Sequence, residues 1–269
     1  MGPYTDWMVH REGASLFLVE YIPDYVGLLN AVPKQFMKAA VRWELRKSTD
    51  RRPTVVLDPQ SVTEFFYGFT DVNELRYIVV NGDFPVEEVK TALTVERNFE
   101  DAEQTIGGYD VLTKGPTDIV GLTESQFVWT KVGFADPVEN FEAVLDGIGS
   151  NATTFPSRNE TYSLLMDNLP DGHLVQTRPT VVEGIDAEAY GRQYTVSNDG
   201  ERTEATEVFV YANEVTADDV RAEVNENSRI ASGDRGVIER IRADGRVVTV
   251  DFSPILTGNV FSLSGYTRD

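Results

Sequence analysis

The sequence predicts an α+β protein of two similar modules, each an antiparallel sheet with helices packed on one face and with a ferredoxin-like tendency. Three observations predict this class. Short segments rich in β-branched and aromatic residues alternate with segments of helical periodicity. Strong turn signals, such as Asn198-Asp199-Gly200 and Ala243-Asp244-Gly245, separate neighbouring strands. A pattern of strand, turn and helix also occurs once in each half of the chain.

The repeated pattern covers residues 75–93 and 206–224. A shift of 131 residues aligns the two copies without a gap, and Val79/Val210 and Val89/Val220 are then identities. Both copies begin their helix with paired acids, which the helix dipole favours in the first turn. These features predict an internal duplication. The alternative is that any strand, acidic turn and helix would look alike.

The boundary between the predicted modules is a polar segment. Residues 150–159 directly follow Gly149 and contain Asn151, Pro156 and Asn159. They show no helical or strand periodicity, which indicates a linker or long loop. The first α+β module therefore covers residues 1–149 and the second covers residues 160–269.

Apolar periodicity and turn signals predict the individual elements. In the first module, strands are expected at 15–22, 54–57, 77–80, 109–113, 118–122 and 126–132, and helices at 33–47, from Pro85 onward and at 136–148. The aromatic run at 62–69 is interpreted as part of the core. In the second module, strands are expected at 173–182, 187–197, 206–212, 237–242 and 246–252, and helices at 161–169 and after the capping residue Thr216.

The charge balance indicates an unusual solvent environment. The 269 residues include 24 Lys and Arg against 44 Asp and Glu, for a formal net charge of -20, and only 6 of the basic residues are lysine. Nucleic acid is an unlikely partner because phosphate contacts need clustered basic residues. An acid-rich, lysine-poor chain is typical of proteins in molar salt, where screening weakens self-repulsion. The alternative is an ordinary acidic protein from a dilute environment.

One predicted helix departs from the acidic character of the chain. In the helix at 33–47, Lys34, Lys38, Arg42 and Arg46 recur every four residues and form a basic stripe. The stripe could bind an anionic lipid or an acidic partner. The alternative is a solvated face that balances acidic neighbours in the same protein.

The residues that most often serve in catalysis or metal binding predict no catalytic, cofactor or metal site. The chain has no cysteine, and its histidines, His10 and His173, belong to no recognisable triad. His173 is interpreted as a turn or strand-start residue. Two acceptor sequons, Asn151-Ala-Thr and Asn159-Glu-Thr, lie in or beside the predicted linker and are candidate N-glycosylation sites if the chain is exported.

Four short blocks of sequence carry a family resemblance. They are Tyr4-Thr5-Asp6-Trp7, Val80-Asn81-Gly82-Asp83-Phe84, Gly108-Tyr109-Asp110-Val111 and Leu169-Pro170-Asp171-Gly172. Together they resemble blocks of haloarchaeal secreted proteins and lipoproteins of unassigned function. The resemblance implies a halophilic archaeal protein of the cell surface or the extracellular space. It transfers no catalytic residues, and this chain lacks a lipobox, so any lipid anchor would require an N-terminal segment that has been removed.

Three functional hypotheses follow. The first is a non-enzymatic binding or structural protein at the cell surface, with an unknown protein or surface component as its partner. The second is a carboxylate-dependent hydrolase with a site between the modules. The third is a cytoplasmic protein that binds a partner through the basic helix at 33–47. No apolar run is long enough to predict a membrane span.

Overall fold

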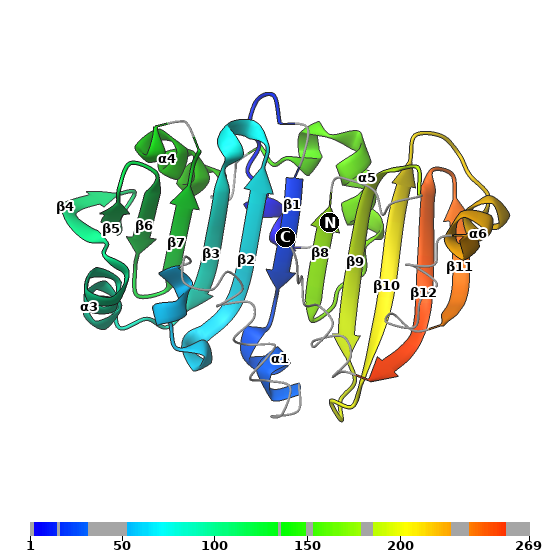
Figure 1. Ribbon diagram of the computed structural model, residues 1–269, viewed down its shortest axis with the longest axis horizontal. Coiled ribbons are helices and arrows are strands. Elements are labelled where there is room, and N and C mark those ends of the chain that lie inside the picture. Colours follow the sequence, from blue (N-terminus) through cyan, green and yellow to red (C-terminus); the bar gives the residue numbers. More distant parts are fainter. Residues whose placement is uncertain are drawn as a thin grey trace.

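The computed structural model has a single twelve-stranded antiparallel sheet at its centre (Figure 1). The structure describes residues 3–14, 17–31, 53–133, 136–148, 153–178, 185–226 and 237–256. The strands are β1 (Phe17–Ile22), β2 (Val62–Thr70), β3 (Arg76–Gly82), β4 (Glu100–Ile106), β5 (Tyr109–Lys114), β6 (Asp118–Leu122), β7 (Gln126–Lys131), β8 (Leu174–Arg178), β9 (Ala187–Val196), β10 (Arg202–Tyr211), β11 (Ile238–Asp244) and β12 (Val247–Leu256). A large antiparallel sheet with few helices confirms the α+β class.

The order of the strands joins the two halves of the chain in one sheet. It runs β11-β12-β10-β9-β8-β1-β2-β3-β7-β6-β5-β4, so the pairing of β1 with β8 joins the two halves. Val19 lies opposite Thr177, and Tyr21 lies opposite Val175. The predicted two-module duplication and ferredoxin-like tendency are not confirmed.

The helices lie on both faces of the sheet. They are α1 (Tyr25–Ala31), α3 (Val86–Arg97), α4 (Pro137–Gly147), α5 (Glu160–Asn168) and α6 (Ala217–Glu226), with short 3-10 turns η1 (Pro3–Trp7), η2 (Pro53–Val56), η3 (Pro59–Ser61), η4 (Val72–Glu74) and η5 (Pro156–Arg158). One core contains apolar side chains of α1, α3 and α6, and the other contains those of α4, α5 and the segment after η1. The helix predicted at 33–47 lies outside the described residues.

Side-chain caps begin the helices where the sequence predicts them. Asp136 accepts hydrogen bonds from the N–H groups of Val138 and Glu139 at the start of α4. The Thr216 hydroxyl accepts one from the Asp219 N–H, and the Asp219 carboxylate accepts one from the Thr216 N–H. This reciprocal pair satisfies N–H groups that have no partner inside the helix, and the predicted cap of α6 is confirmed.

The segment at the predicted boundary packs against the sheet. In its described part, residues 153–159, Phe155 is buried, with its ring 5.2 Å from that of Phe17 and 4.9 Å from that of Tyr162. Val9 forms an isolated antiparallel bridge with Thr154. The described part of the segment therefore contributes to the core behind β1 and α5.

The edge strand β4 has no counterpart among the predicted strands. Its sequence is mostly polar and acidic, so it lacks the apolar alternation that marks a strand. Its pairing with β5 is interrupted between Asp101 and Thr105, and Glu103 has a φ of 53°. Charges and irregular pairing of this kind discourage an exposed edge from pairing with another chain.

A polar row crosses the centre of the sheet. Glu20, Gln176, Arg192 and Glu207 lie opposite one another on β1, β8, β9 and β10. Gln176 donates a 3.2 Å hydrogen bond to Glu20 and accepts a 2.8 Å one from Arg192. Burial acts to lower the pKa of Arg192, but Tyr194 and the flanking acidic groups raise it overall. The row therefore holds a cation between two buried carboxylates.

Tyr77 anchors the N-terminal segment on the opposite face. Its buried hydroxyl accepts a 3.1 Å hydrogen bond from the Val9 N–H and donates a 2.6 Å one to the Trp7 carbonyl. Burial raises the pKa of Tyr77 well above its usual range. The hydroxyl therefore remains a neutral donor and acceptor at all physiological pH values.

Replacing Tyr77 with phenylalanine should release this anchor. We expect Tyr77→Phe to lower the free energy of unfolding by about 1–3 kcal/mol, because it leaves two buried backbone groups without their partner. Urea unfolding measures the change. Tyr194→Phe is the control, since the Tyr194 hydroxyl makes no hydrogen bond to the described residues, and it should stay within about 0.5 kcal/mol of the wild type. Equal effects of the two substitutions would contradict the anchor.

Candidate functional site

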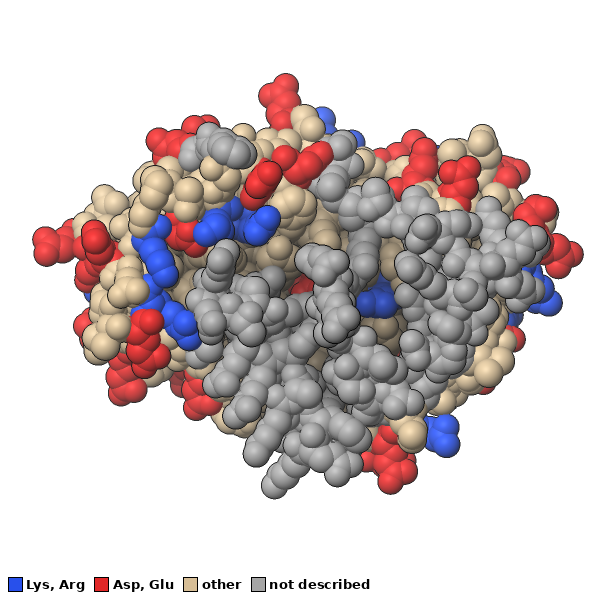
Figure 2. All heavy atoms as spheres, in the orientation of Figure 1, with Lys and Arg blue, Asp and Glu red and all other residues tan. Residues whose placement is uncertain are grey.

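Basic side chains gather on one face of the sheet beside α3. Arg76 on β3 lies opposite Lys131 on β7, Lys131 lies opposite Asp118 on β6, and Asp118 lies opposite Lys114 on β5. Directly opposed residues of an antiparallel pair point to the same face. Figure 2 shows Lys and Arg grouped on the left of this face, over the part of the sheet that contains β3 to β5. We call Arg76, Lys131, Lys114, Lys90 and Arg97 the basic strip.

Helix α3 supplies two members of the basic strip. Lys90 contacts Asp101 at 3.1 Å and Asp110 at 3.6 Å, and its hydrogen bond to Asp101 raises its pKa. Arg97 lies in the last turn of the helix. The helix ends at Asn98, which adopts a left-handed conformation with a φ of 57°. This turn places Phe99, which is buried, beneath the Lys114 ammonium, 5.7 Å from the ring centre.

Only part of the charge on the basic strip is neutralised. Lys131 forms a 2.8 Å ion pair with Asp118, which also accepts a 3.2 Å hydrogen bond from the Trp129 indole. Arg76 lies over the ring of Phe69, 5.6 Å from its centre. Among the described residues, no carboxylate forms an ion pair with Arg76, Arg97 or Lys114. Within the described part of the chain, the strip therefore carries more positive charge than its carboxylate partners neutralise, although the net charge of the chain is -20.

This arrangement suits the binding of an anionic group. Guanidinium and ammonium groups donate charge-assisted hydrogen bonds to carboxylate, sulfate and phosphate. Phe69 and Phe99 support two of the cations from below, which holds them in place without neutralising them.

The resolved pKa shifts of described carboxyl groups do not have the direction that acid catalysis requires. Where the structure resolves a shift among the described carboxyl groups, at Asp101, Asp199 and Asp219, hydrogen bonds lower the pKa. A general acid needs a raised pKa. The described part of the chain also contains no group of three or more His, Asp or Glu side chains placed to hold a metal ion.

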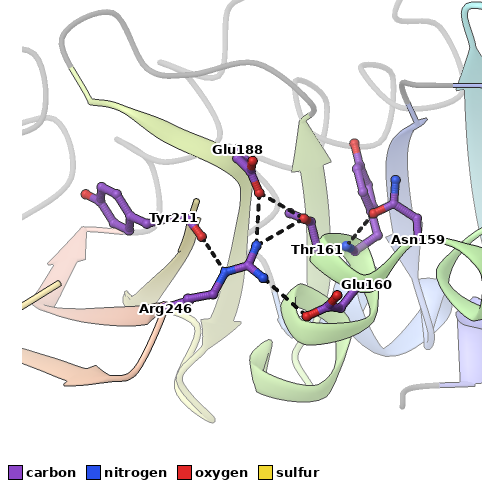
Figure 3. A network of polar contacts seen from close by, with 7 residues as sticks. Asn159, Glu160, Thr161, Glu188, Tyr211 and Arg246 are labelled. Carbon is purple, nitrogen blue, oxygen red and sulfur yellow. Dashed lines mark hydrogen bonds and ion pairs between the residues drawn. The ribbon is translucent and has the colours of Figure 1, made fainter. Parts of the chain in front are cut away.

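A second polar cluster surrounds Arg246 (Figure 3). Its guanidinium forms ion pairs with Glu160 at 3.2 Å and Glu188 at 3.0 Å, and it donates a 2.8 Å hydrogen bond to the Tyr211 carbonyl. The Thr161 hydroxyl donates a 3.0 Å hydrogen bond to Glu188. These contacts fasten the start of α5 to β9 and to the turn before β12, and we interpret the cluster as structural.

The structure places only some of the predicted site residues. Lys34, Lys38, Arg42, Arg46 and Asn151 lie outside the described residues.

The other candidates are resolved as structural groups. Asn159 is the N-cap of α5, where its side-chain oxygen accepts a 3.0 Å hydrogen bond from the Tyr162 N–H. His173 directly precedes β8, and its ring nitrogen accepts a 2.9 Å hydrogen bond from the Val196 N–H. His173 is therefore a strand-start residue, as predicted.

The basic strip was not predicted because its members are far apart in the sequence. Part of it could nevertheless have been predicted from the hairpin turns. The turn at Thr123-Glu124-Ser125 predicts a hairpin, and its register places Asp118 opposite Lys131. The turn at residues 115–117, between β5 and β6, would then place Lys114 opposite Asp118.

Comparisons with solved structures find the same fold elsewhere. The fold is similar to that of TP0453. Crystal form I of TP0453 aligns with a TM-score of 0.60 and 10% identity, over 98% of this chain and 96% of that one. Form III gives a TM-score of 0.58 at 10% identity, with 98% of each chain covered. Form IV also gives 0.58 at 10% identity, over 97% of this chain and 95% of TP0453.

The likeness to TP0453 concerns the fold alone, because the identity is so low. No protein-family model matches the sequence, and no curated protein matches it. Within the described ranges, no helix combines the length and apolar character needed to cross a bilayer.

The Arg246 cluster yields a stability prediction. We expect Arg246→Ala to lower the free energy of unfolding by about 1–2 kcal/mol, because it removes a charge-assisted bond to a backbone carbonyl and two ion pairs. Arg240→Ala is the matched control. Arg240 is exposed on the edge strand β11 and forms no ion pair or side-chain hydrogen bond with the described residues, so its removal should cost less than about 0.5 kcal/mol. Thermal unfolding of both variants decides whether the cluster fastens α5.

Proposed function

We propose that this chain is a non-enzymatic binding protein at the exterior of a salt-adapted archaeal cell, and that its basic strip contacts an anionic group of its partner. The observation that carries the binding role is the surplus charge of Arg76, Arg97 and Lys114. In a chain with a net charge of -20, these three side chains form no ion pair with a described carboxylate, so they can bind an anionic group of a partner.

The distribution of acidic residues supports salt adaptation. Asp and Glu are exposed around the outline of the molecule in Figure 2. Many lie close in sequence, such as Glu87 and Glu88 on α3 and Asp218 and Asp219 on α6, and all four are exposed. Their mutual repulsion is weak only where salt shortens the Debye length to about 3 Å, as at 1 M.

Molar salt also limits what the basic strip can do. Screening removes long-range attraction, so only groups in direct contact retain much of their interaction. Guanidinium and ammonium groups supported on aromatic rings meet this condition, since their attraction to an anion depends on close hydrogen bonds. The proposed partner therefore presents an anionic group at short range, and long-range attraction contributes little.

The exterior location rests on the resemblance to haloarchaeal secreted proteins and lipoproteins. The alternative of a cytoplasmic partner-binding protein would use the helix at 33–47 instead. The hydrolase alternative has no observation in its favour, since the resolved shifts at described carboxyl groups lower the pKa.

We also infer that the two halves arose by duplication. From the β1–β8 pair outward, one half reads β8-β9-β10-β12-β11 and the other reads β1-β2-β3-β7-β6. In both halves the helix follows the third strand, and α3 and α6 begin at Val86 and Ala217, 131 residues apart. The hairpin β4–β5 is then an insertion between α3 and β6. These correspondences support the repeat that the sequence predicts.

Charge reversal tests the proposed contact. We expect the double variant Arg76→Glu/Lys114→Glu to bind a sulfated polysaccharide resin at least about tenfold more weakly than the wild type, because each substitution replaces an attraction with a repulsion. The control Arg221→Glu/Arg240→Glu makes the same change in net charge at exposed positions on α6 and β11. Equal weakening in both variants would show that only net charge matters and would contradict the site.

Salt dependence tests the proposed environment. We expect the free energy of unfolding to rise by about 2 kcal/mol between 0.1 and 3 M KCl, which raises the melting temperature by roughly 4–8 °C, because screening relieves repulsion among exposed acids. Sucrose at matched osmolality separates this effect from general solute exclusion. A melting temperature that stays constant or falls in KCl would argue for a protein from a dilute environment.

A further inference from the structure

Asn159 presents an amide nitrogen that has no hydrogen-bond partner among the described residues. Its side-chain oxygen caps α5 by accepting the 3.0 Å hydrogen bond from the Tyr162 N–H. Its side-chain nitrogen makes no hydrogen bond to any described residue, and the residue is half-buried. The neighbours Arg158 and Glu160 are both exposed. The cap uses only the oxygen of a half-buried side chain that has exposed neighbours on both sides.

The chemistry of an N-linked sugar is compatible with this cap. Glycosyl transfer joins the Asn159 side-chain nitrogen to the anomeric carbon of a sugar activated as a phosphate ester. The bond between that carbon and the phosphate oxygen breaks, the phosphate leaves with the electron pair, and the amide loses one proton to a base. The product keeps the carbonyl oxygen as an acceptor. A sugar at Asn159 would thus leave the hydrogen bond to Tyr162 in place.

The third residue of the sequon is engaged in the folded protein. The Thr161 hydroxyl donates a 3.0 Å hydrogen bond to Glu188 and accepts a 3.4 Å one from Arg246 (Figure 3). Residues Glu160 and Thr161 also form the first turn of α5. An enzyme that must recognise the hydroxyl would therefore compete with the Arg246 cluster once α5 has packed on the sheet.

From these observations we infer that Asn159 carries an N-linked sugar, attached before α5 packs against β9 and β12. The inference rests on the proposed exterior location, because it requires passage through a compartment that glycosylates exported chains. It concerns Asn159 alone, since Asn151 lies outside the described residues.

Peptide mapping of the full-length protein expressed in its source cell tests this inference. Arg158 lies between the two sequons, so tryptic cleavage after it places Asn151 and Asn159 on separate peptides. We expect the peptide that begins at Asn159 to carry a mass increment of whole sugar residues. We expect the same increment in Thr161→Ser, which keeps the sequon.

The decisive comparison uses Asn159→Asp. Aspartate is as good an N-cap as asparagine but lacks the acceptor nitrogen, so this variant should lose the increment while the unglycosylated form keeps its unfolding midpoint. Thr161→Val should lose the increment and also unfold earlier, because it removes the bond to Glu188. An unmodified Asn159 peptide overturns the inference. If that unmodified protein is recovered from the cell exterior, the proposed location stands without the sugar, and if it is recovered from the cytoplasm, both fail.

The timing is tested on the purified chain. Membranes from the source cell, supplied with the activated sugar donor, should glycosylate a urea-unfolded chain after dilution, and they should modify the folded chain at least about tenfold more slowly. Equal rates on folded and unfolded chains would overturn the claim that modification precedes packing. The variant Arg246→Ala, which loosens the cluster around Thr161, should raise the rate on the folded chain.

Discussion

The antiparallel pairing of β1 with β8 is the constraint on which the rest of the structure depends. It connects strands that are more than 150 positions apart in the chain and turns two shorter sheets into one of twelve strands. The polar row from Glu20 to Glu207 crosses this pair at Glu20 and Gln176 and places the half-buried Arg192 between two buried carboxylates. A buried charged row tolerates little change of register, since a slip would leave a charge without its partner. We therefore regard the row as the feature that specifies how the two halves join.

The two faces of the sheet have different roles. One face holds the helices α4 and α5 and the N-terminal segment, which Tyr77 and the Arg246 cluster fasten in place. The other face carries the basic strip beside α3, where aromatic rings support Arg76 and Lys114, which form no ion pair with the described carboxylates. The proposed binding role would use this arrangement, because a preorganised surface loses little entropy when its partner docks.

Individual elements show where sequence reasoning succeeds and where it stops. The caps at Asp136 and Thr216 were predictable because a cap depends on residues within three positions of one another. Strand β4 was not, because its acidic side chains face solvent at the edge of the sheet and leave no apolar pattern. Only part of the basic strip was predictable from the sequence. The hairpin turns determine the register of β5, β6 and β7, but they do not determine that β3 pairs with β7.

By itself, the sequence determined the α+β class, most strands, the starts of α4 and α6 and the acidic, lysine-poor composition. Each of these depends on composition or on residues a few positions apart. Sequence reasoning missed α1, and the strand predicted at 54–57 was wrong, because η2 covers most of that segment. Only the tertiary structure decided that the two halves share one sheet and that Arg76, Lys131 and Lys114 lie on one face. The physical reason is that strands pair through backbone N–H and C=O groups, which every residue except proline carries in the same form. The identity of a distant partner strand is therefore set by the packing of the whole core.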